Sequence, residues 1–308
     1  IAEGNECSPG TIRLLRVLDP KESVALLVAA SSERDRSNEQ RLAIVDALAT
    51  MNAADAARAV VGVLSEENNP QLRDRALAVI DRNVDNGWAA LLDNATLQEA
   101  LRAMVHDGEA SPQALDFIAR HHLDFLGNEV LAVCQSDDVA DEIRAKAIDA
   151  AVSLQLAEAG SALAQLISEE ESKQLRLAAA RGLVRLQAWA EVEKLFAASA
   201  ESAGELQQAT VDAMLETTDG ALVLLRLVKN DRLGDAHRDK AIALAVTHPD
   251  SNVRVLFESF LPEDQRPVRL GSAIEPEKIL TLEGNVERGR EIFFRSTAAQ
   301  CNRCHAID

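Results

Sequence analysis

The sequence predicts an all-α fold in which helical hairpins stack into a right-handed α-α superhelix, followed by a small C-terminal module. Three observations lead to this prediction. Alanine and leucine dominate the 308 residues, aromatic residues make up 3% and tyrosine is absent, a usage that favours helix over strand. Apolar residues recur with helical spacing through residues 11–261. The pattern repeats about every 32 residues, as expected for stacked hairpins.

Seven anchor positions define the repeat, and each is expected near the start of the first helix of a hairpin. Small or apolar side chains follow each anchor after three, four and seven residues, so they share one helix face. The step from Arg73 to Ser111 is longer than the others and predicts an extra turn or loop near 88–96. The anchors are Arg41, Arg73, Ser111, Arg144, Arg176, Gln207 and Arg238.

A second helix is expected after each first helix, with breaks rich in Pro, Gly and Asn between them. Pro70 and Pro112 are placed to begin helices, because a proline in the first turn loses no helical hydrogen bond. One hairpin cannot bury both of its apolar faces, whereas a stack of hairpins can. The clearest second helices are expected over 54–64, 156–167, 192–200 and 221–228.

The anchor arginine and the alanines and aliphatic residues after it, as in 144–152 and 176–184, resemble HEAT repeats. The resemblance covers roughly residues 11–261 and implies an ARM-like α solenoid. Residues 1–261 are therefore expected to form one helical-repeat domain, with 1–10 as an irregular lead-in. Repeat arrays of this kind offer extended binding surfaces, so protein partners are expected.

Composition changes after residue 261. Four of the eight prolines lie between Pro249 and Pro276, and residues 262–283 are interpreted as a Pro-rich linker that contains a short helix over 276–282. A fresh helix is expected from Gly284 onward, and it leads directly to Cys301. Residues 284–308 are therefore treated as a third segment.

The strongest chemical signal is the run Cys301-Asn302-Arg303-Cys304-His305, which has the C-x-x-C-H pattern of c-type haem attachment. In such a site two thiols bond covalently to the vinyl groups of one porphyrin, and the adjacent imidazole is an axial iron ligand. The pattern therefore predicts haem c bound covalently through Cys301 and Cys304, with His305 on the iron.

Three other interpretations of the cysteine pair remain open. A thioredoxin-like redox pair would open a helix after a strand, and no strand pattern precedes Cys301. Zinc needs about four ligands, and Cys7 and Cys134 lie far away in sequence. The pair could also form a simple disulfide or have no role.

The segment from Gly284 through Gly289, Phe293 and Phe294 to C-x-x-C-H resembles the opening of a class I cytochrome c domain. The resemblance implies that Gly289 lies where the first helix crosses a later one and that a phenylalanine packs near the haem edge. Such a domain needs further helices and a sixth ligand, commonly Met. Since three residues follow His305, we expect a truncated haem domain, with haem absent or disordered in this chain.

The joined pattern of HEAT array, linker and C-x-x-C-H also resembles the C-terminal half of large haem-binding dehydrogenase-like proteins of planctomycetes and verrucomicrobia. This resemblance implies an upstream dehydrogenase domain or a redox protein as partner. Covalent haem attachment further implies a periplasmic or otherwise extracytoplasmic parent protein. The residues supply no phosphate-binding glycine loop, Ser/His/Asp set or H-E-x-x-H motif, so no catalytic residue is assigned and enzyme activity stays open.

Charge and hydropathy set limits on partners. The net charge is −18, and residues 1–261 carry −17 of it, so nucleic acid and anionic lipid would be repelled. No run of 18 apolar residues exists, so no transmembrane segment is expected. The acidic run 169–171 is interpreted as a solvated loop. Met51, Met104, Met214 and Cys134 are expected in the core.

Two functions follow from these patterns. The first is an extracytoplasmic electron-transfer protein segment whose helical repeats support a c-type haem. The second is a protein-binding solenoid without a redox role, in which the C-x-x-C pair binds zinc or is idle.

Overall fold

The computed structural model describes residues 20–306 apart from 34, 52, 67–68, 107–110, 169–170, 198–202, 268–275 and 297–299. All regular secondary structure in these residues is helical, so the fold is all-α, as predicted. The expected lead-in 1–10 and the onset of helical periodicity at Thr11 lie outside the described residues. The chain divides into two compact units, Ile1–Leu256 (unit 1) and Phe257–Asp308 (unit 2).

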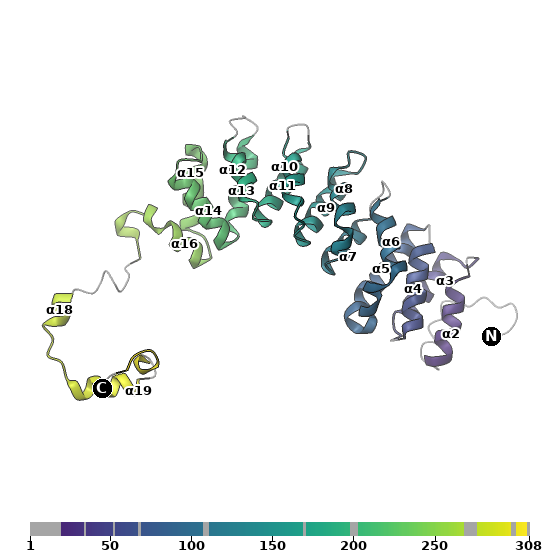
Figure 1. Cartoon of the computed structure of the whole chain (residues 1–308), viewed down its shortest axis with the longest axis horizontal. Helices are drawn as coiled ribbons and strands as arrows, with labels where there is room; N and C mark the ends of the chain where they lie inside the picture. Colours follow the sequence, from purple (N-terminus) through teal and green to yellow (C-terminus); the bar gives the residue numbers. More distant parts are fainter. Residues whose placement is uncertain are drawn as a thin grey trace. The chain divides into compact units, whose positions relative to one another are not determined.

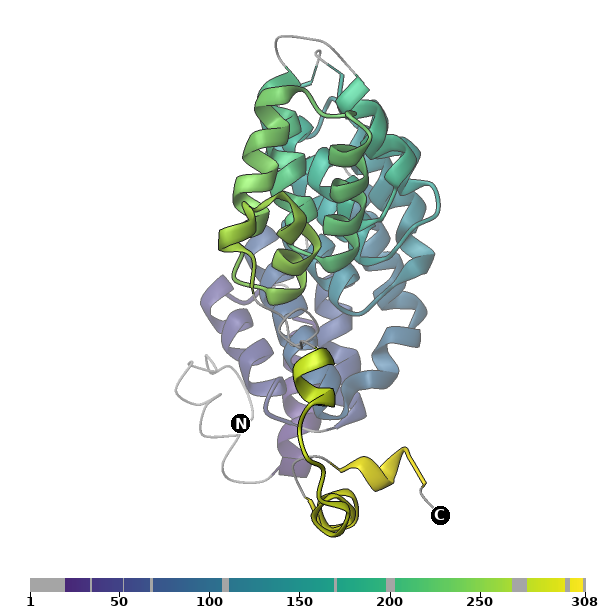
Figure 2. The ribbon, with the colours of Figure 1, turned by 90° about the vertical axis from the view of Figure 1, so that its left-hand side faces the viewer.

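The helices of unit 1 alternate between two layers, which Figure 2 shows side by side. One layer holds the first helix of each hairpin and the other holds the second, with the core between them. The first helices are α3 (Asn38–Leu48), α5 (Pro70–Asn83), α7 (Pro112–Arg120), α9 (Asp141–Ser153), α11 (Lys173–Arg185), α13 (Ala203–Leu215) and α15 (Asp235–Val246). The other helices are α2 (Pro20–Ser31), α4 (Ala54–Glu66), α6 (Ala95–His106), α8 (Gly127–Gln135), α10 (Ala159–Gln165), α12 (Trp189–Ala197), α14 (Thr218–Lys229) and α16 (Ser251–Phe257).

Neighbouring hairpins pack against each other in sequence order (Figure 1). Each first helix contacts the next first helix from α3 through to α15, and each second helix from α2 to α12 contacts the next in its own layer. Within a hairpin, pairs such as α11 with α12 and α13 with α14 also pack together. Most apolar residues of these helices are therefore buried by sequence neighbours, although Leu26, Leu222, Leu244 and Val255 remain exposed.

The repeat positions identified in the sequence form this core. The residues three, four and seven positions after each anchor are buried in every hairpin, except that Ile242 on α15 is partly exposed. Six of the anchors lie in first helices, while Ser111 precedes α7 and accepts a hydrogen bond from the Ala114 amide at 3.4 Å. Alanines at many of these positions allow the close approach of neighbouring helices.

The longer step between Arg73 and Ser111 is taken up by extra helical turns. After α5 the chain forms the π-helical turn Val84–Trp88 (η1) and the 3-10 turn Ala89–Asp93 (η2) before α6 begins. Gly87 has φ 107°, a left-handed conformation that a side chain would strain. The turn buries Trp88 in unit 1, where it fills the added space.

Three successive hairpins share a left-handed residue in the turn between their two helices. His122, Gln155 and Gln187 have φ of 50°, 52° and 55°, and each follows its anchor by 11 residues. None of them is glycine, so each position carries a backbone cost of about 1–2 kcal/mol that the packed helices on either side must offset.

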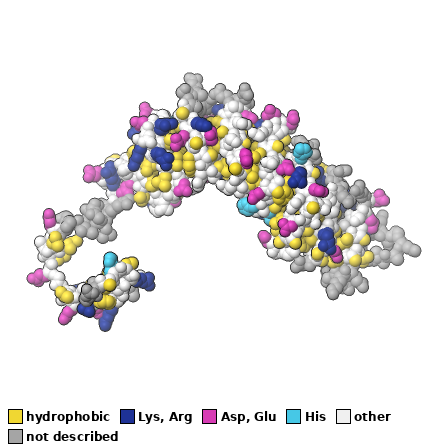
Figure 3. Space-filling view, in the orientation of Figure 1, with side chains coloured by type: hydrophobic (Ala, Val, Ile, Leu, Met, Phe, Trp, Pro, Cys, Tyr) yellow, Lys and Arg dark blue, Asp and Glu magenta, His cyan; other side chains and the backbone are white. Residues whose placement is uncertain are grey.

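The charged residues of unit 1 form two kinds of ion pair. Exposed pairs join neighbouring first helices, such as Asp116 with Lys146 at 2.9 Å and Asp149 with Arg185 at 2.7 Å. Such pairs contribute little to stability because water screens them. Figure 3 shows the acidic and basic side chains interspersed over one face of unit 1.

Arg144 forms a buried ion pair. Its side chain is 4% exposed and donates to both carboxylate oxygens of Glu171, at 2.8 and 3.1 Å. Its Nε donates to the Cys134 carbonyl oxygen at 3.0 Å. Interpreting the whole run 169–171 as solvated was therefore wrong for Glu171, because the arginine anchor of one hairpin reaches the loop that precedes the next.

The four residues predicted to lie in the core are inside unit 1. Met51, Met104, Met214 and Cys134 are buried, as expected for residues that fill gaps between helices. Burial raises the pKa of the Cys134 thiol to about 12, since an apolar environment disfavours the thiolate, although the nearby Arg144 opposes the shift. Cys134 is therefore an unreactive core residue.

Unit 2 consists of short helices with few buried side chains. They are η4 (Glu258–Phe260), η5 (Glu263–Gln265), α18 (Pro276–Leu280), α19 (Val286–Arg295) and η6 (Cys301–Arg303). Helix α18 begins at the predicted proline and ends two residues earlier than predicted, and the predicted domain boundaries at 261 and 283 stay predictions. Across the described residues of both units, no helix is both long and apolar enough to span a membrane.

Candidate cofactor-attachment site

The cysteine motif follows the C-terminal end of helix α19 in the chain. Asn285 begins the helix, because its side-chain oxygen accepts a hydrogen bond from the Arg288 amide at 2.9 Å. The Ser296 amide donates to the Ile292 carbonyl at 3.1 Å, at the point where the helix ends. Ile292 and Phe294 remain substantially exposed on this helix, so its apolar residues lack cover from the described part of unit 2.

The motif itself forms a single tight turn. Gln300 has φ 47°, and this left-handed residue reverses the chain into η6. The Cys304 and His305 amides both donate to the Cys301 carbonyl, at 3.3 and 3.0 Å. Residues three apart in a 3-10 turn lie above one another, which brings Cys301 and Cys304 to the same side. His305, the third residue that the sequence singled out, follows the turn directly.

Contacts with α19 hold this turn in place. The Asn302 side-chain amide donates to the Phe294 carbonyl at 3.4 Å. The Phe294 ring lies edge-on to Phe293, with centroids 5.0 Å apart, and the Arg290 guanidinium lies 5.8 Å from the Phe294 ring centroid. Asn302 and Arg290 were not expected as site residues, because Asn302 occupies a position that the C-x-x-C-H pattern leaves unspecified and Arg290 lies outside the pattern.

The chemistry of the three side chains fits a covalently held porphyrin. Cys304 and His305 are exposed and Cys301 is partly exposed, so a flat ligand could reach them from outside. Neither cysteine is in a disulfide. Thiols and a neutral imidazole are the groups that c-type haem attachment uses, and the exposed Ile292 and Phe294 supply apolar surface nearby.

Other parts of the predicted haem site are not brought together. Residues 257–308 contain no Met and no His besides His305. The three methionines are buried in unit 1, as predicted for core residues. A Cβ added at Gly289 would meet no atom within 4 Å, so the predicted helix crossing there stays a prediction. Among the described residues, no group of three or more His, Cys, Asp and Glu side chains is arranged to hold a metal ion.

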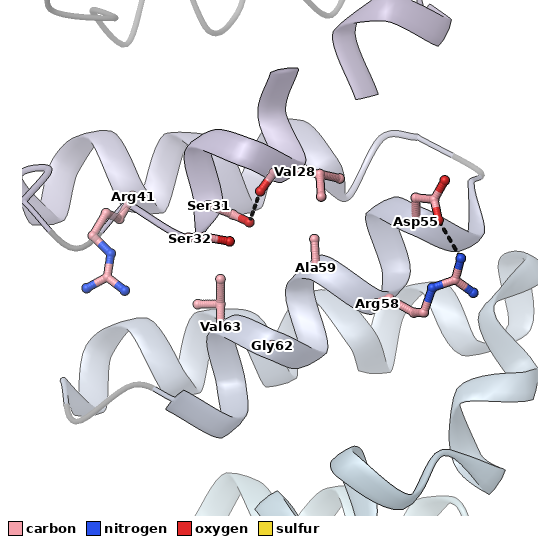
Figure 4. Close-up of a pocket in the computed structure, with 9 residues that line it drawn as sticks. All are labelled: Val28, Ser31, Ser32, Arg41, Asp55, Arg58, Ala59, Gly62 and Val63. Carbon is pink, nitrogen blue, oxygen red and sulfur yellow. Dashed lines mark hydrogen bonds and ion pairs between the residues drawn. The ribbon is translucent and has the colours of Figure 1, made fainter. Parts of the chain in front are cut away.

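A hollow with a volume of about 330 Å³ lies between α2, α3 and α4 in unit 1 (Figure 4). Asp55 and Arg58 on its wall pair with each other, and the Ser31 hydroxyl donates to the Val28 carbonyl at 2.7 Å. Ser32 and Arg41 also line the hollow.

Two described histidines of unit 1, His121 and His237, make contacts between hairpins. His121 Nε2 lies 2.8 Å from the Asp81 carboxylate, and its ring packs against Phe117 with centroids 4.5 Å apart. His237 Nε2 lies 2.9 Å from the Gly204 carbonyl oxygen. These contacts join neighbouring hairpins, which is why the histidines occur near helix ends.

Comparison with known proteins assigns no family. No protein-family model and no curated protein matches the sequence. The site is therefore interpreted from its own residues and geometry.

Proposed function

We propose that this chain is a segment of an extracytoplasmic electron-transfer protein, in which a HEAT-like helical solenoid supports a c-type haem on the C-terminal segment 284–308. The observation that carries the proposal is the single turn at the end of unit 2. It places two accessible thiols three residues apart in one turn, followed directly by an exposed imidazole, and this is the order and spacing that haem attachment uses.

Each residue of the turn has a role in this proposal. Cys301 and Cys304 hold the porphyrin through thioether bonds, which form when each thiol adds across a vinyl group. His305 supplies an imidazole nitrogen to the iron. A bound haem would supply one-electron transfer between ferric and ferrous iron. Asn302 keeps the turn against α19, while Ile292 and Phe294 offer apolar surface to the macrocycle.

The role of the helical array is that of a scaffold that docks partners. Two layers of helices in sequence order give a long surface. Arrays of this kind commonly bind proteins along an extended face. The partner of this chain is a redox protein or a dehydrogenase domain of the same parent protein.

The test is covalent haem attachment. The full-length parent protein would be exported together with cytochrome c maturation proteins and examined by haem staining and pyridine haemochrome spectra. We expect covalent haem in the unaltered parent protein, one thioether bond in Cys301→Ala or Cys304→Ala, and none when both are changed. Cys134→Ala is the matched control, because it removes a buried thiol and should leave haem attachment unchanged.

The second candidate function predicts a different result in the same experiment. If the chain is only a protein-binding solenoid, the exported protein carries no covalent haem. Metal analysis then distinguishes its two forms, since stoichiometric zinc that is lost in the double cysteine variant shows a zinc site, and absence of both metals shows an idle pair. Either result would reject the redox proposal.

A further inference from the structure

The extra turn η1 between α5 and α6 contains an Asn-Gly pair, which is the only one in the 308 residues. Asn86 and Gly87 are both exposed, while Val84 and Trp88 on either side of them are buried. Among the described residues η1 is also the only π-helical turn. Turns of this type are rare, so the pair lies where unit 1 departs from the regular geometry of its other hairpins.

An Asn-Gly pair is chemically reactive because glycine has no Cβ to shield its backbone nitrogen. The Gly87 nitrogen can bond to the side-chain carbonyl carbon of Asn86, and the side-chain nitrogen then leaves as ammonia with the proton of the Gly87 amide. The resulting five-membered succinimide adds water and opens at either of its carbonyl groups. The products are aspartate and isoaspartate, and neither step needs an enzyme, an oxidant or a cofactor.

The folded turn holds this pair in an unreactive geometry. The Asn86 side-chain nitrogen donates to the Arg82 carbonyl at 2.8 Å, so the leaving group is held in a hydrogen bond. Asn86 has ψ 31°, which turns the Gly87 nitrogen away from the Asn86 side chain. Ring closure brings this nitrogen onto the side-chain carbonyl carbon and requires a rotation about ψ. The reaction therefore requires η1 to open.

We propose that Asn86 is a site of spontaneous deamidation and that local opening of η1 controls its rate. Exposed turns open more often than the packed core, and residues 85–87 form such a turn. Conversion to isoaspartate inserts the Cβ atom of this residue into the main chain. It also replaces the amide that donates to the Arg82 carbonyl with a carboxylate, which cannot donate. The modified chain no longer fits the turn, and this inference is independent of haem attachment.

Peptide mass spectrometry of the full chain, incubated at mildly alkaline pH with and without denaturing urea, tests the proposal. Asn83 and Asn94 are matched controls in the same tryptic peptide, because Val84 and Ala95 after them have a Cβ. We expect Asn86 to convert in the unfolded chain while the two controls stay intact, and to convert about tenfold or more slowly in the folded chain. Asn86→Gln should abolish the conversion, because glutamine would have to close a larger ring.

Opening of the turn provides a second measurement. Trp88→Ala removes the buried ring beside the pair and should raise the rate of conversion at Asn86 in the folded chain. Trp189→Ala is the matched control, since this tryptophan is partly exposed on α12 and should leave the rate unchanged. Circular dichroism shows whether each variant is folded. Urea below the unfolding transition of the unaltered chain should raise the rate in the same way, without any substitution.

The outcomes are distinct. Conversion confined to Asn86, and faster whenever η1 opens, supports the proposal. Equal conversion of Asn83 or Asn94, or an unfolded chain in which Asn86 stays intact, overturns the assignment of the site. A folded chain that converts as fast as the unfolded chain, or not at all over about a hundred half-times of the unfolded chain, overturns the control by opening.

Discussion

Unit 1 and unit 2 bury their apolar residues to very different degrees. In unit 1 each hairpin covers its neighbours, so residues such as Leu48, Ile80 and Ile118 are fully buried. In unit 2, α19 has no buried residue, and Ile292 and Phe294 remain exposed. The difference shows that the repeats supply each other's partners, whereas α19 and the cysteine turn need a partner from outside their own described residues.

The largest expected effect compares two phenylalanines. Phe117→Ala on α7 should lower the free energy of unfolding by about 3–5 kcal/mol, because the ring is buried and its removal leaves a cavity. Phe294→Ala on α19 should cost less than about 1 kcal/mol, because the ring is 46% exposed. Urea unfolding followed by circular dichroism measures both. Equal costs would contradict the contrast between the two units.

A smaller effect separates buried from exposed ion pairs within unit 1. Glu171→Gln should lower the free energy of unfolding by about 2–3 kcal/mol at neutral pH, because it removes the closest countercharge of the buried Arg144 guanidinium and leaves only the longer contacts to Asp137 and Asp141, at 3.7 and 3.9 Å. Glu171 is 18% exposed in this pair. The matched control is Asp149→Asn, which breaks an exposed pair with Arg185 and should cost less than about 0.5 kcal/mol. A Glu171→Gln variant as stable as the control would show that the buried pair is weak.

The next effect concerns pH. Because burial raises the pKa of the Cys134 thiol to about 12, the unfolded chain loses this proton near pH 9 while the folded chain keeps it. The contribution of this thiol to the free energy of unfolding is therefore complete below pH 9. It is lost progressively between pH 9 and 12, by up to about 1.4 kcal/mol per pH unit.

Cys134→Ala removes this contribution and provides the measurement. Its free energy of unfolding is compared with that of the unaltered chain at pH 8 and pH 10. We expect the stability advantage of the unaltered chain to shrink by about 1 kcal/mol between these two pH values. An advantage that stays constant would mean that the thiol is solvated in unit 1.

The smallest effect concerns α19 alone. Asn285→Ala removes the side-chain oxygen that accepts from the Arg288 amide and should destabilise the helix by about 1 kcal/mol. Amide hydrogen exchange along α19 measures the loss. Asn285→Asp keeps an acceptor and should retain the protection of the unaltered chain. If both variants exchange at the same rate as the unaltered chain, the cap does not hold the helix.

Much of unit 1 could be predicted because its packing is local in sequence. A residue four positions after an anchor is buried by a helix about 32 residues away, so apolar spacing and its repeat identify the core. The pairing of Arg144 with Glu171 could not be predicted. Arginine and glutamate are usually solvated, and spacing does not indicate which of three adjacent acidic residues turns inward.

The attachment site was predictable only in part. Cys301, Cys304 and His305 are recognisable because covalent attachment requires thiols at fixed spacing, and one helical turn follows from that spacing. The contact of Asn302 with the Phe294 carbonyl depends on the left-handed Gln300, which no sequence pattern indicates. A second iron ligand could not be assigned, because no Met or further His occurs in 257–308.

The left-handed residues His122, Gln155 and Gln187 determine how unit 1 would respond to mechanical tension. Each of these residues closes a helix with a local hydrogen bond, because the amide after it donates to the carbonyl five positions earlier: Leu123 to Ile118, Leu156 to Ala151 and Ala188 to Leu183. A pulling force that peels away one hairpin would therefore leave the ends of its helices defined. The array should therefore yield in discrete steps, one hairpin at a time, and act as an extensible spring between whatever is attached to its ends.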